Sequence, residues 1–244
     1  MQNKNYSLYR PENPTVREAY SMLAGNIHVG SEQKKIKSLV ITSVEPKIGK
    51  TSIATSLAIT MATWGKRTLL VDADLRKQSD KSQLNALGVK GTYQYLQGII
   101  SFEDVLCSTN IDNLVYIPNG RVSGNPMGIL CSKNLTDLID IAGQHFDYII
   151  FDTPSLGSVS DAAIISSKTD ATILVASLGK TKLGVIKQAK ETIEKNNGNL
   201  LGVVVNRVKK SEYRRYFESY DYFYKSHKNA VREDNHKVLE TLQT

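Results

Sequence analysis

The sequence predicts an α/β fold, a three-layer sandwich built around a mainly parallel β-sheet. Short apolar runs without polar alternation, such as residues 67–72 and 147–152, are typical of strands that helices cover on both faces. Segments with apolar side chains at helical spacing separate these runs. Acidic residues end two of the runs, and a Gly-Lys-Thr triplet follows a third. Polar groups are therefore expected at the carboxyl edge of the sheet, where parallel sheets bind ligands.

The expected helices and strands alternate along the chain. After an extended lead, Thr15 and Glu18 have the spacing of a capping box, so the first helix is expected to start there. Strands are expected at residues 37–43, 67–72, 113–117, 147–152, 171–177 and 201–206. Helices are expected at residues 51–64, around 83–87, 93–96 and 102–107, and at 133–142, 161–167 and 185–195. Gly65 is a natural stop for the helix at residues 51–64.

The composition is that of a soluble globular protein, with 41% hydrophobic and 23% charged residues among 244. This length allows one sizeable core. The chain has no apolar run of membrane-spanning length and its start lacks the apolar centre of a signal peptide, so a cytoplasmic location is expected. The two cysteines, Cys107 and Cys131, are expected to be small buried hydrophobes rather than a disulfide or a zinc pair.

The chain divides into three segments by composition. Residues 1–35 form an extended segment and a helix, residues 36–210 form the core, and residues 211–244 form a tail that is expected to be mobile and partly disordered. Residues 207–232 contain eight Lys and Arg against three Asp and Glu. This excess of positive charge suits an acidic partner, such as a nucleic acid, an anionic lipid or an acidic protein surface. The alternative is that the charges simply form a solvated helix face. The tail contains a cluster of tyrosines, Tyr213, Tyr216, Tyr220, Tyr222 and Tyr224.

A phosphate-binding loop is predicted between the strand at residues 37–43 and the helix at residues 51–64. Gly49 leaves backbone N–H groups unobstructed, Lys50 supplies an ammonium for the β and γ phosphates, and Thr51 supplies a hydroxyl for Mg²⁺. The amino end of the following helix adds a favourable dipole. Val44 departs from the strict pattern, which has a glycine there. The residues expected to bind nucleotide in this loop are Pro46, Lys47, Ile48, Gly49, Lys50, Thr51 and Ser52.

Acidic residues follow two strands that are expected to lie close to this loop. Asp72 and Asp74 end one strand and Asp152 ends another. Carboxylates there suit Mg²⁺, which takes one or two protein carboxylates and keeps several waters, and a further carboxylate can accept a proton from an attacking hydroxyl. Strand-terminal Asp residues also serve as helix caps and turn formers. Three of them together with Gly-Lys-Thr favour a nucleotide site.

Taken together, these motifs resemble the bacterial tyrosine kinases of capsular and exopolysaccharide synthesis, which have a P-loop NTPase-like core. The resemblance rests on residues 43–51, 69–76 and 149–154 and on the tyrosine cluster. It implies ATP and Mg²⁺ as cofactors and autophosphorylation of the five tail tyrosines in a neighbouring subunit. It implies Lys50, Asp72 and Asp74 as catalytic residues, with Asp72 as the base, and Arg76 and Asn206 as further nucleotide-binding residues. The implied metal ligands are Thr51, Asp72, Asp74 and Asp152.

The same resemblance implies partners. These are a separate membrane-bound activator protein that recruits the chain to the inner face of the membrane, further copies of the chain, and a cognate tyrosine phosphatase; nucleic acid is not expected. The N-terminal helix departs from the family pattern Glu-x-x-Arg-x-x-Arg, because Ser21 and Ala24 stand at the arginine positions after Glu18. Arginines there serve subunit contacts in the family, so ring assembly is not expected from the isolated chain.

Two other functions fit the same core. A partitioning or septum-site ATPase switch would carry an extra lysine five residues before the lysine that matches Lys50, and this chain has Glu45 there. A non-catalytic nucleotide-binding regulator of polysaccharide export would use the tail only for docking. Phosphate on the tail distinguishes this regulator from a kinase.

Overall fold

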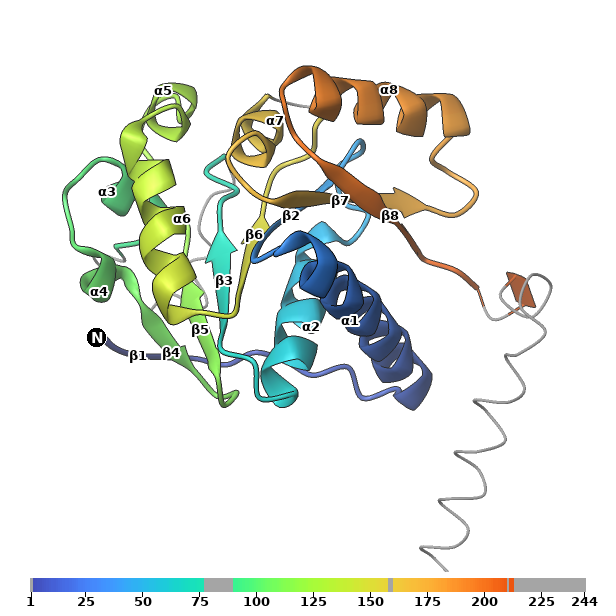
Figure 1. Cartoon of the computed structure of the whole chain (residues 1–244), viewed down its shortest axis with the longest axis horizontal. Helices are drawn as coiled ribbons and strands as arrows, with labels where there is room; N and C mark the ends of the chain where they lie inside the picture. Colours follow the sequence, from blue (N-terminus) through green and yellow to red (C-terminus); the bar gives the residue numbers. More distant parts are fainter. Residues whose placement is uncertain (1, 77–89, 158–159, 210, 213–244) are drawn as a thin grey trace, which may run out of the picture.

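An eight-stranded sheet forms the centre of the part of the chain that the computed structural model describes, residues 2–76, 90–157, 160–209 and 211–212 (Figure 1). The strands are β1 (Gln2–Tyr6), β2 (Ser38–Ser43), β3 (Thr68–Asp72), β4 (Cys107–Thr109), β5 (Leu114–Ile117), β6 (Tyr148–Asp152), β7 (Ala171–Ser177) and β8 (Leu200–Asn206). Their order across the sheet is β1-β4-β5-β3-β6-β2-β7-β8. All pairs are parallel except β4 with β5, which confirms the expected mainly parallel sheet.

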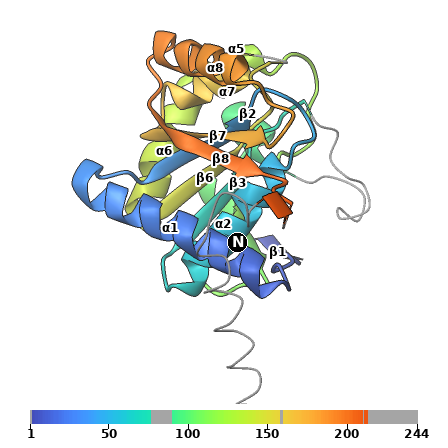
Figure 2. The ribbon, with the colours of Figure 1, turned by 90° about the vertical axis from the view of Figure 1, so that its right-hand side faces the viewer.

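Helices cover both faces of this sheet and complete the expected three layers. Figure 2 shows α1 and α2 below the sheet and α5, α7 and α8 above it. The helices are α1 (Pro14–Lys34), α2 (Lys50–Thr63), α3 (Thr92–Leu96), α4 (Phe102–Val105), α5 (Met127–Leu130), α6 (Lys133–His145), α7 (Asp161–Ser166) and α8 (Leu183–Lys195).

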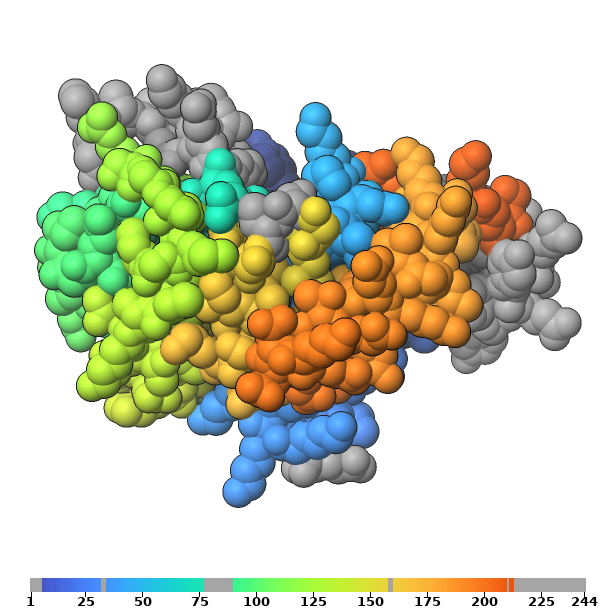
Figure 3. Space-filling view, turned by 90° about the horizontal axis from the view of Figure 1, so that it is seen from above, coloured from blue at the N-terminus to red at the C-terminus, as the bar shows by residue number. Residues whose placement is uncertain are grey.

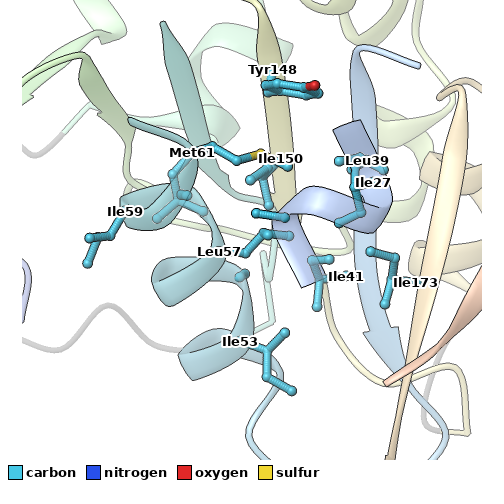
Figure 4. Close-up of a cluster of buried hydrophobic side chains, with 14 of the residues drawn as sticks. Ile27, Leu39, Ile41, Ile53, Leu57, Ile59, Met61, Tyr148, Ile150 and Ile173 are labelled. Atoms are coloured by element: carbon cyan, nitrogen blue, oxygen red, sulfur yellow. The ribbon is translucent and has the colours of Figure 1, made fainter. Parts of the chain in front are cut away.

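The apolar core lies on the two faces of the central strands. On one face, Ile53, Leu57 and Met61 of α2 pack with Ile27 of α1 against the sheet (Figure 4). The opposite face packs against α3 and α6 through a second buried cluster that includes Phe151. Every residue of β2, β6 and β7 is buried, as their continuous apolar runs predicted.

Helix boundaries follow local capping chemistry. The first helix begins at Pro14, and the side chain of Asn13 accepts a hydrogen bond from the Thr15 N–H at 2.9 Å. The expected cap at Thr15 is therefore wrong, because proline suits the first helical turn and Asn13 caps it. At the end of α2, Gly65 has φ 78° and its N–H bonds the Ala62 carbonyl at 2.9 Å, which confirms the expected glycine stop.

Several elements differ from the expectation. Strands β1 and β4 and the short helix α5 were not expected, and Cys107 lies in β4 rather than in a helix. Cys107 is buried, but the expected burial of Cys131 is wrong, because Cys131 is exposed. The expected helix at residues 83–87 and the tail from residue 213 onward lie outside the described residues. Within the described ranges, no helix has both the length and the apolar character needed to cross a membrane.

Candidate active site

The loop between β2 and α2 turns sharply at Gly49. This residue has φ 98°, a conformation that favours glycine. A Cβ atom here would also lie too close to Asn206 Nδ2, so the Asn206 side chain would have to move from its place beside the loop. Lys50 begins α2, and Thr51 and Ser52 in its first turn are exposed. The loop therefore presents an open helix start with a lysine and two hydroxyls, which is the arrangement that binds phosphate.

Residues after β7 and at the end of β8 hold this loop from one side. Asn206 donates through Nδ2 to the Ile48 carbonyl at 2.8 Å, and Arg207 donates through Nη2 to the Lys47 carbonyl at 2.5 Å. Glu45 accepts a hydrogen bond from the Thr181 hydroxyl at 2.7 Å. Lys47 has φ 59°, a backbone conformation that residues other than glycine rarely adopt. The hydrogen bonds from Asn206 and Arg207 brace this turn.

The segment after β6 holds the start of the same loop. The N–H groups of Leu156 and Gly157 donate to the carbonyls of Ser43 and Val44, at 2.7 and 3.1 Å. A Cβ atom on Gly157 would lie 2.5 Å from the Val44 carbonyl oxygen, so this approach depends on glycine. Figure 3 views this edge from above and shows the loop (light blue), the end of β3 (teal) and the segment after β6 (yellow) reaching the same surface.

The two acidic strand ends meet beside the loop. Asp72 and Asp152 are partners in the register of β3 and β6, and β6 lies between β3 and β2. Asp152 is 5% exposed, whereas Asp72 and Asp74 are half-buried. Asp72 accepts through Oδ1 from the Asp74 N–H at 3.1 Å. The sheet therefore brings together all three carboxylates that the sequence singled out.

Tyr116 of β5 lies next to Asp72. Its hydroxyl donates to Asp72 Oδ2 at 3.5 Å, and its ring meets that of Tyr6 edge to face with centroids 4.9 Å apart. Burial, together with the nearby Asp72 charge, raises the pKa of Tyr116 well above its ordinary value. Tyr116 therefore stays protonated and acts as a donor, which favours the carboxylate form of Asp72.

The donor types fit Mg²⁺ bound jointly with nucleotide. Within the described part of the chain, no group of three or more His, Cys, Asp or Glu side chains is placed to hold a metal ion by itself. The ion would instead rely on the Thr51 hydroxyl, phosphate oxygens and the strand-end carboxylates. All of these are hard oxygen ligands, and Mg²⁺ is ordinarily bound through one or two carboxylates plus substrate phosphates.

Two predicted site residues make contacts that the sequence did not indicate. Asn206, expected to bind nucleotide, supports the loop through Ile48. Arg76 directs its guanidinium to Asp161, with Nε to Oδ2 at 2.7 Å and Nη2 to Oδ1 at 2.9 Å. Asp161 was expected only as the start of a helix, and nothing in its local sequence signals this contact. The five predicted acceptor tyrosines lie outside the described residues.

Comparisons with known proteins support a kinase. A family model described as "AAA domain" matches residues 37–201. The tyrosine-protein kinase CpsD of Streptococcus agalactiae is 38% identical over 195 residues, which are 80% of this chain and 84% of that protein. The kinase domain of the Escherichia coli tyrosine kinase ETK has a TM-score of 0.73 and 27% identity, covering 78% of this chain and 74% of that one.

A septum-site protein shows how far the fold alone extends. The septum site-determining protein MinD from Pyrococcus horikoshii, in complex with Mg-ADP, has a TM-score of 0.59 and 23% identity, covering 72% of each chain. This likeness indicates a shared P-loop NTPase-like α/β fold and no more. The similarity to CpsD is closer and spans most of the chain, so the chain belongs to the bacterial tyrosine-protein kinases, which are built on a P-loop ATPase fold.

Proposed function

We propose that this tyrosine kinase uses Mg·ATP to phosphorylate its own tail tyrosines, Tyr213, Tyr216, Tyr220, Tyr222 and Tyr224, and thereby regulates capsular or exopolysaccharide synthesis and export. The observation that carries the proposal is the register of Asp72 with Asp152 beside the Gly49-Lys50-Thr51 loop. This register brings two carboxylates together beside a loop suited to phosphate, which supports the proposal of a base and metal ligands at one nucleotide site. Relatives with this fold are named tyrosine-protein kinases.

Each residue has a defined part in the transfer. Lys50 contacts the β and γ phosphates, and Asp72 accepts the phenolic proton as the tyrosine oxygen attacks the γ-phosphorus and ADP leaves. Thr51, Asp74 and Asp152 would hold Mg²⁺, which offsets the charge that develops on the phosphate oxygens when it is bound. Tyr116 donates a hydrogen bond to Asp72 Oδ2 at 3.5 Å and so helps to orient this carboxylate.

The tyrosines of the described fold are poor acceptors. Tyr93 and Tyr95 are 3% and 8% exposed, and the Tyr93 hydroxyl is bonded to the Ser123 carbonyl. Tyr9, at 87% exposure, is an exception that an experiment must control. The tail tyrosines, in contrast, belong to a sequence without a core-forming pattern. Transfer to another copy of the chain is then the natural geometry, which requires self-association.

The N-terminal helix bears on that self-association. Ala24, at one of the two expected arginine positions, is fully buried in the core cluster that α1 shares with α2. This position therefore serves the packing of its own chain. We propose that contacts among copies depend on a separate membrane-bound activator, which recruits the kinase to the inner face of the membrane, and that a cognate phosphatase reverses the modification.

The structure offers no support for the septum-site type of switch. At the position of the extra lysine, Glu45 carries the opposite charge and is bonded to Thr181 within the same chain. A carboxylate there would repel a phosphate group, whereas a lysine would attract it. A non-catalytic nucleotide-binding regulator would have the same nucleotide site, but it would transfer no phosphate to the tail.

Phosphosite mapping tests the kinase and its acceptor together. The full chain, a variant with all five tail tyrosines changed to Phe, and Asp72→Asn are incubated with Mg·ATP and the cytoplasmic end of the candidate activator. Wild type should gain phosphotyrosine, whereas both variants should lose nearly all of it. A truncation after Ser211 should bind ATP but incorporate almost no phosphate. Persistent phosphotyrosine on Tyr9, Tyr93, Tyr95 or Tyr116 in these variants would refute the tail as the main acceptor.

A further inference from the structure

Arg76 and Asp161 form a forked ion pair at the edge of the active site. Nε donates to Oδ2 at 2.7 Å and Nη2 donates to Oδ1 at 2.9 Å. The side chain of Asp161, the first residue of α7, is fully buried, while that of Arg76 is 38% exposed. The planar guanidinium matches both carboxylate oxygens, a geometry that lysine cannot reproduce. This pair links positions 85 residues apart in sequence.

The pairing makes Arg76 a poor ligand for an incoming phosphate. If these two nitrogens turned toward an anion, the buried carboxylate of Asp161 would lose its cation, which is strongly unfavourable. The hydrogen bonds that Arg76 donates to Asp161 also raise the pKa of Arg76, against the lowering effect of burial. The neighbouring carboxylate further weakens the attraction of this guanidinium for an anion, because the two charges partly cancel at a distance.

Residues 72–76 form a series of local hydrogen bonds that ends at this pair. Asp72 accepts from the Asp74 N–H at 3.1 Å, and Asp74 accepts through Oδ1 from the Arg76 N–H at 3.4 Å. At the near end, the Ala73 N–H donates to the Asp152 carbonyl at 2.8 Å. The segment that carries Asp72 and Asp74 is therefore held to β6 at one end and to α7, the helix that follows β6, at the other.

We propose that Arg76 is a positioning residue, which through Asp161 fixes Asp72 and Asp74 relative to Asp152, and that it does not bind the nucleotide phosphates. This role rests on the proposed function, in which Asp72 takes the proton and Asp74 helps to hold Mg²⁺. It replaces the sequence-based expectation that Arg76 contacts nucleotide. A misplacement of about 1 Å at a reacting group is enough to slow a reaction on the order of 100-fold.

The test compares Arg76→Gln, Asp161→Asn and the double variant in the full chain. Calorimetry measures the affinity for ADP with and without Mg²⁺, and phosphotransfer assays give kcat and KM. Both single variants should bind ADP alone as wild type does, need more Mg²⁺ for tight ADP binding, and show kcat about 10- to 100-fold lower. The double variant should be no slower than either single variant, because it leaves no unpaired buried charge.

A matched control pair lies at the other end of the same two strands. Arg67, just before β3, pairs with Asp147, just before β6, with Nη2 and Oδ1 3.2 Å apart. The control variant, Arg67→Gln with Asp147→Asn, should keep the wild-type kcat and the wild-type Mg²⁺ requirement. If the control variant lost as much kcat as the Arg76 variants, then any ion pair between these segments would have the same effect, and the proposal would be overturned.

Other outcomes decide the remaining points. Weaker binding of ADP alone by Arg76→Gln, beside wild-type behaviour of Asp161→Asn, would make Arg76 a phosphate ligand and overturn the proposal. If Arg76→Gln does not fold, a folded double variant with wild-type kcat also overturns it. Failure of the proposed function gives a different result, in which wild type itself transfers no phosphate. The Mg²⁺ dependence of ADP binding then decides, and an unchanged dependence in all variants overturns the positioning role.

Discussion

Replacing Asn206 by alanine should weaken nucleotide binding by loosening the phosphate loop. The Asn206 side chain donates to the Ile48 carbonyl at 2.8 Å, and Ile48 is 3% exposed. Losing a donor to a buried carbonyl costs about 1–3 kcal/mol, because the acceptor is left without its partner. If the loop bears all of this cost, the affinity for ADP should fall about 5- to 150-fold.

Calorimetry with ADP and with pyrophosphate separates support of the loop from a contact with the adenine. Support of the loop predicts that both ligands lose affinity by similar factors. A loss confined to ADP, with wild-type affinity for pyrophosphate, would refute the reasoning and place Asn206 at the base. Asn199→Ala is the matched control, since Asn199 lies just before β8 and donates to the Asp170 carbonyl at 2.9 Å, at the opposite end of the strand. Its ADP affinity should equal that of wild type.

Four further outcomes are expected. Lys50→Met should abolish phosphorylation, because the β and γ phosphates lose their close cation; normal ATP binding and phosphorylation by this variant would show that the site is misassigned. Gly157→Ala should lower the unfolding free energy by about 1–3 kcal/mol in chemical denaturation, since the new Cβ would lie 2.5 Å from a backbone oxygen of the loop. The control Gly143→Ala should not lower it, because a Cβ at Gly143 would have no neighbouring atom within 4 Å. Burial, with a smaller effect of Cys107, raises the pKa of Tyr6 from 10.0 to about 12, so the contribution of Tyr6 to stability is complete below pH 10 and is lost as the pH rises to about 12. Tyr6→Phe should make that fall in unfolding free energy shallower, and an unchanged slope would contradict the assignment. The isolated chain should be a monomer or a small oligomer at micromolar concentration, and light scattering that reports a stable octamer without a partner would count against the interpretation of α1.

The positions of the strands and of the phosphate loop could be predicted because their signals are local. A strand buried on both faces must be apolar along its length, as residues 149–151 are, and a loop that cradles phosphate must place glycine, lysine and a hydroxyl in consecutive positions. Asp72 and Asp152 were identified for the same reason, since each directly follows an apolar run, and Asp74 lies two residues after Asp72. The edge strand β1 and its neighbour β4 were missed because β1 is polar in sequence and β4 has only three residues, so neither contains such a run.

The distances between these pieces depended on the order of strands in the sheet. Because β6 lies between β3 and β2, Asp152 stands in register with Asp72 and next to the loop, although 80 residues separate the two carboxylates in sequence. No local pattern contains that order. The same holds for the hydrogen bond from Asn206 to the Ile48 carbonyl and for the ion pair of Arg76 with Asp161. Both join segments that are far apart in sequence and that packing brings together. The sequence by itself determined which groups are available for chemistry, and the tertiary structure decided which of them lie together beside the phosphate loop and which hydrogen-bond to the segments that carry the others.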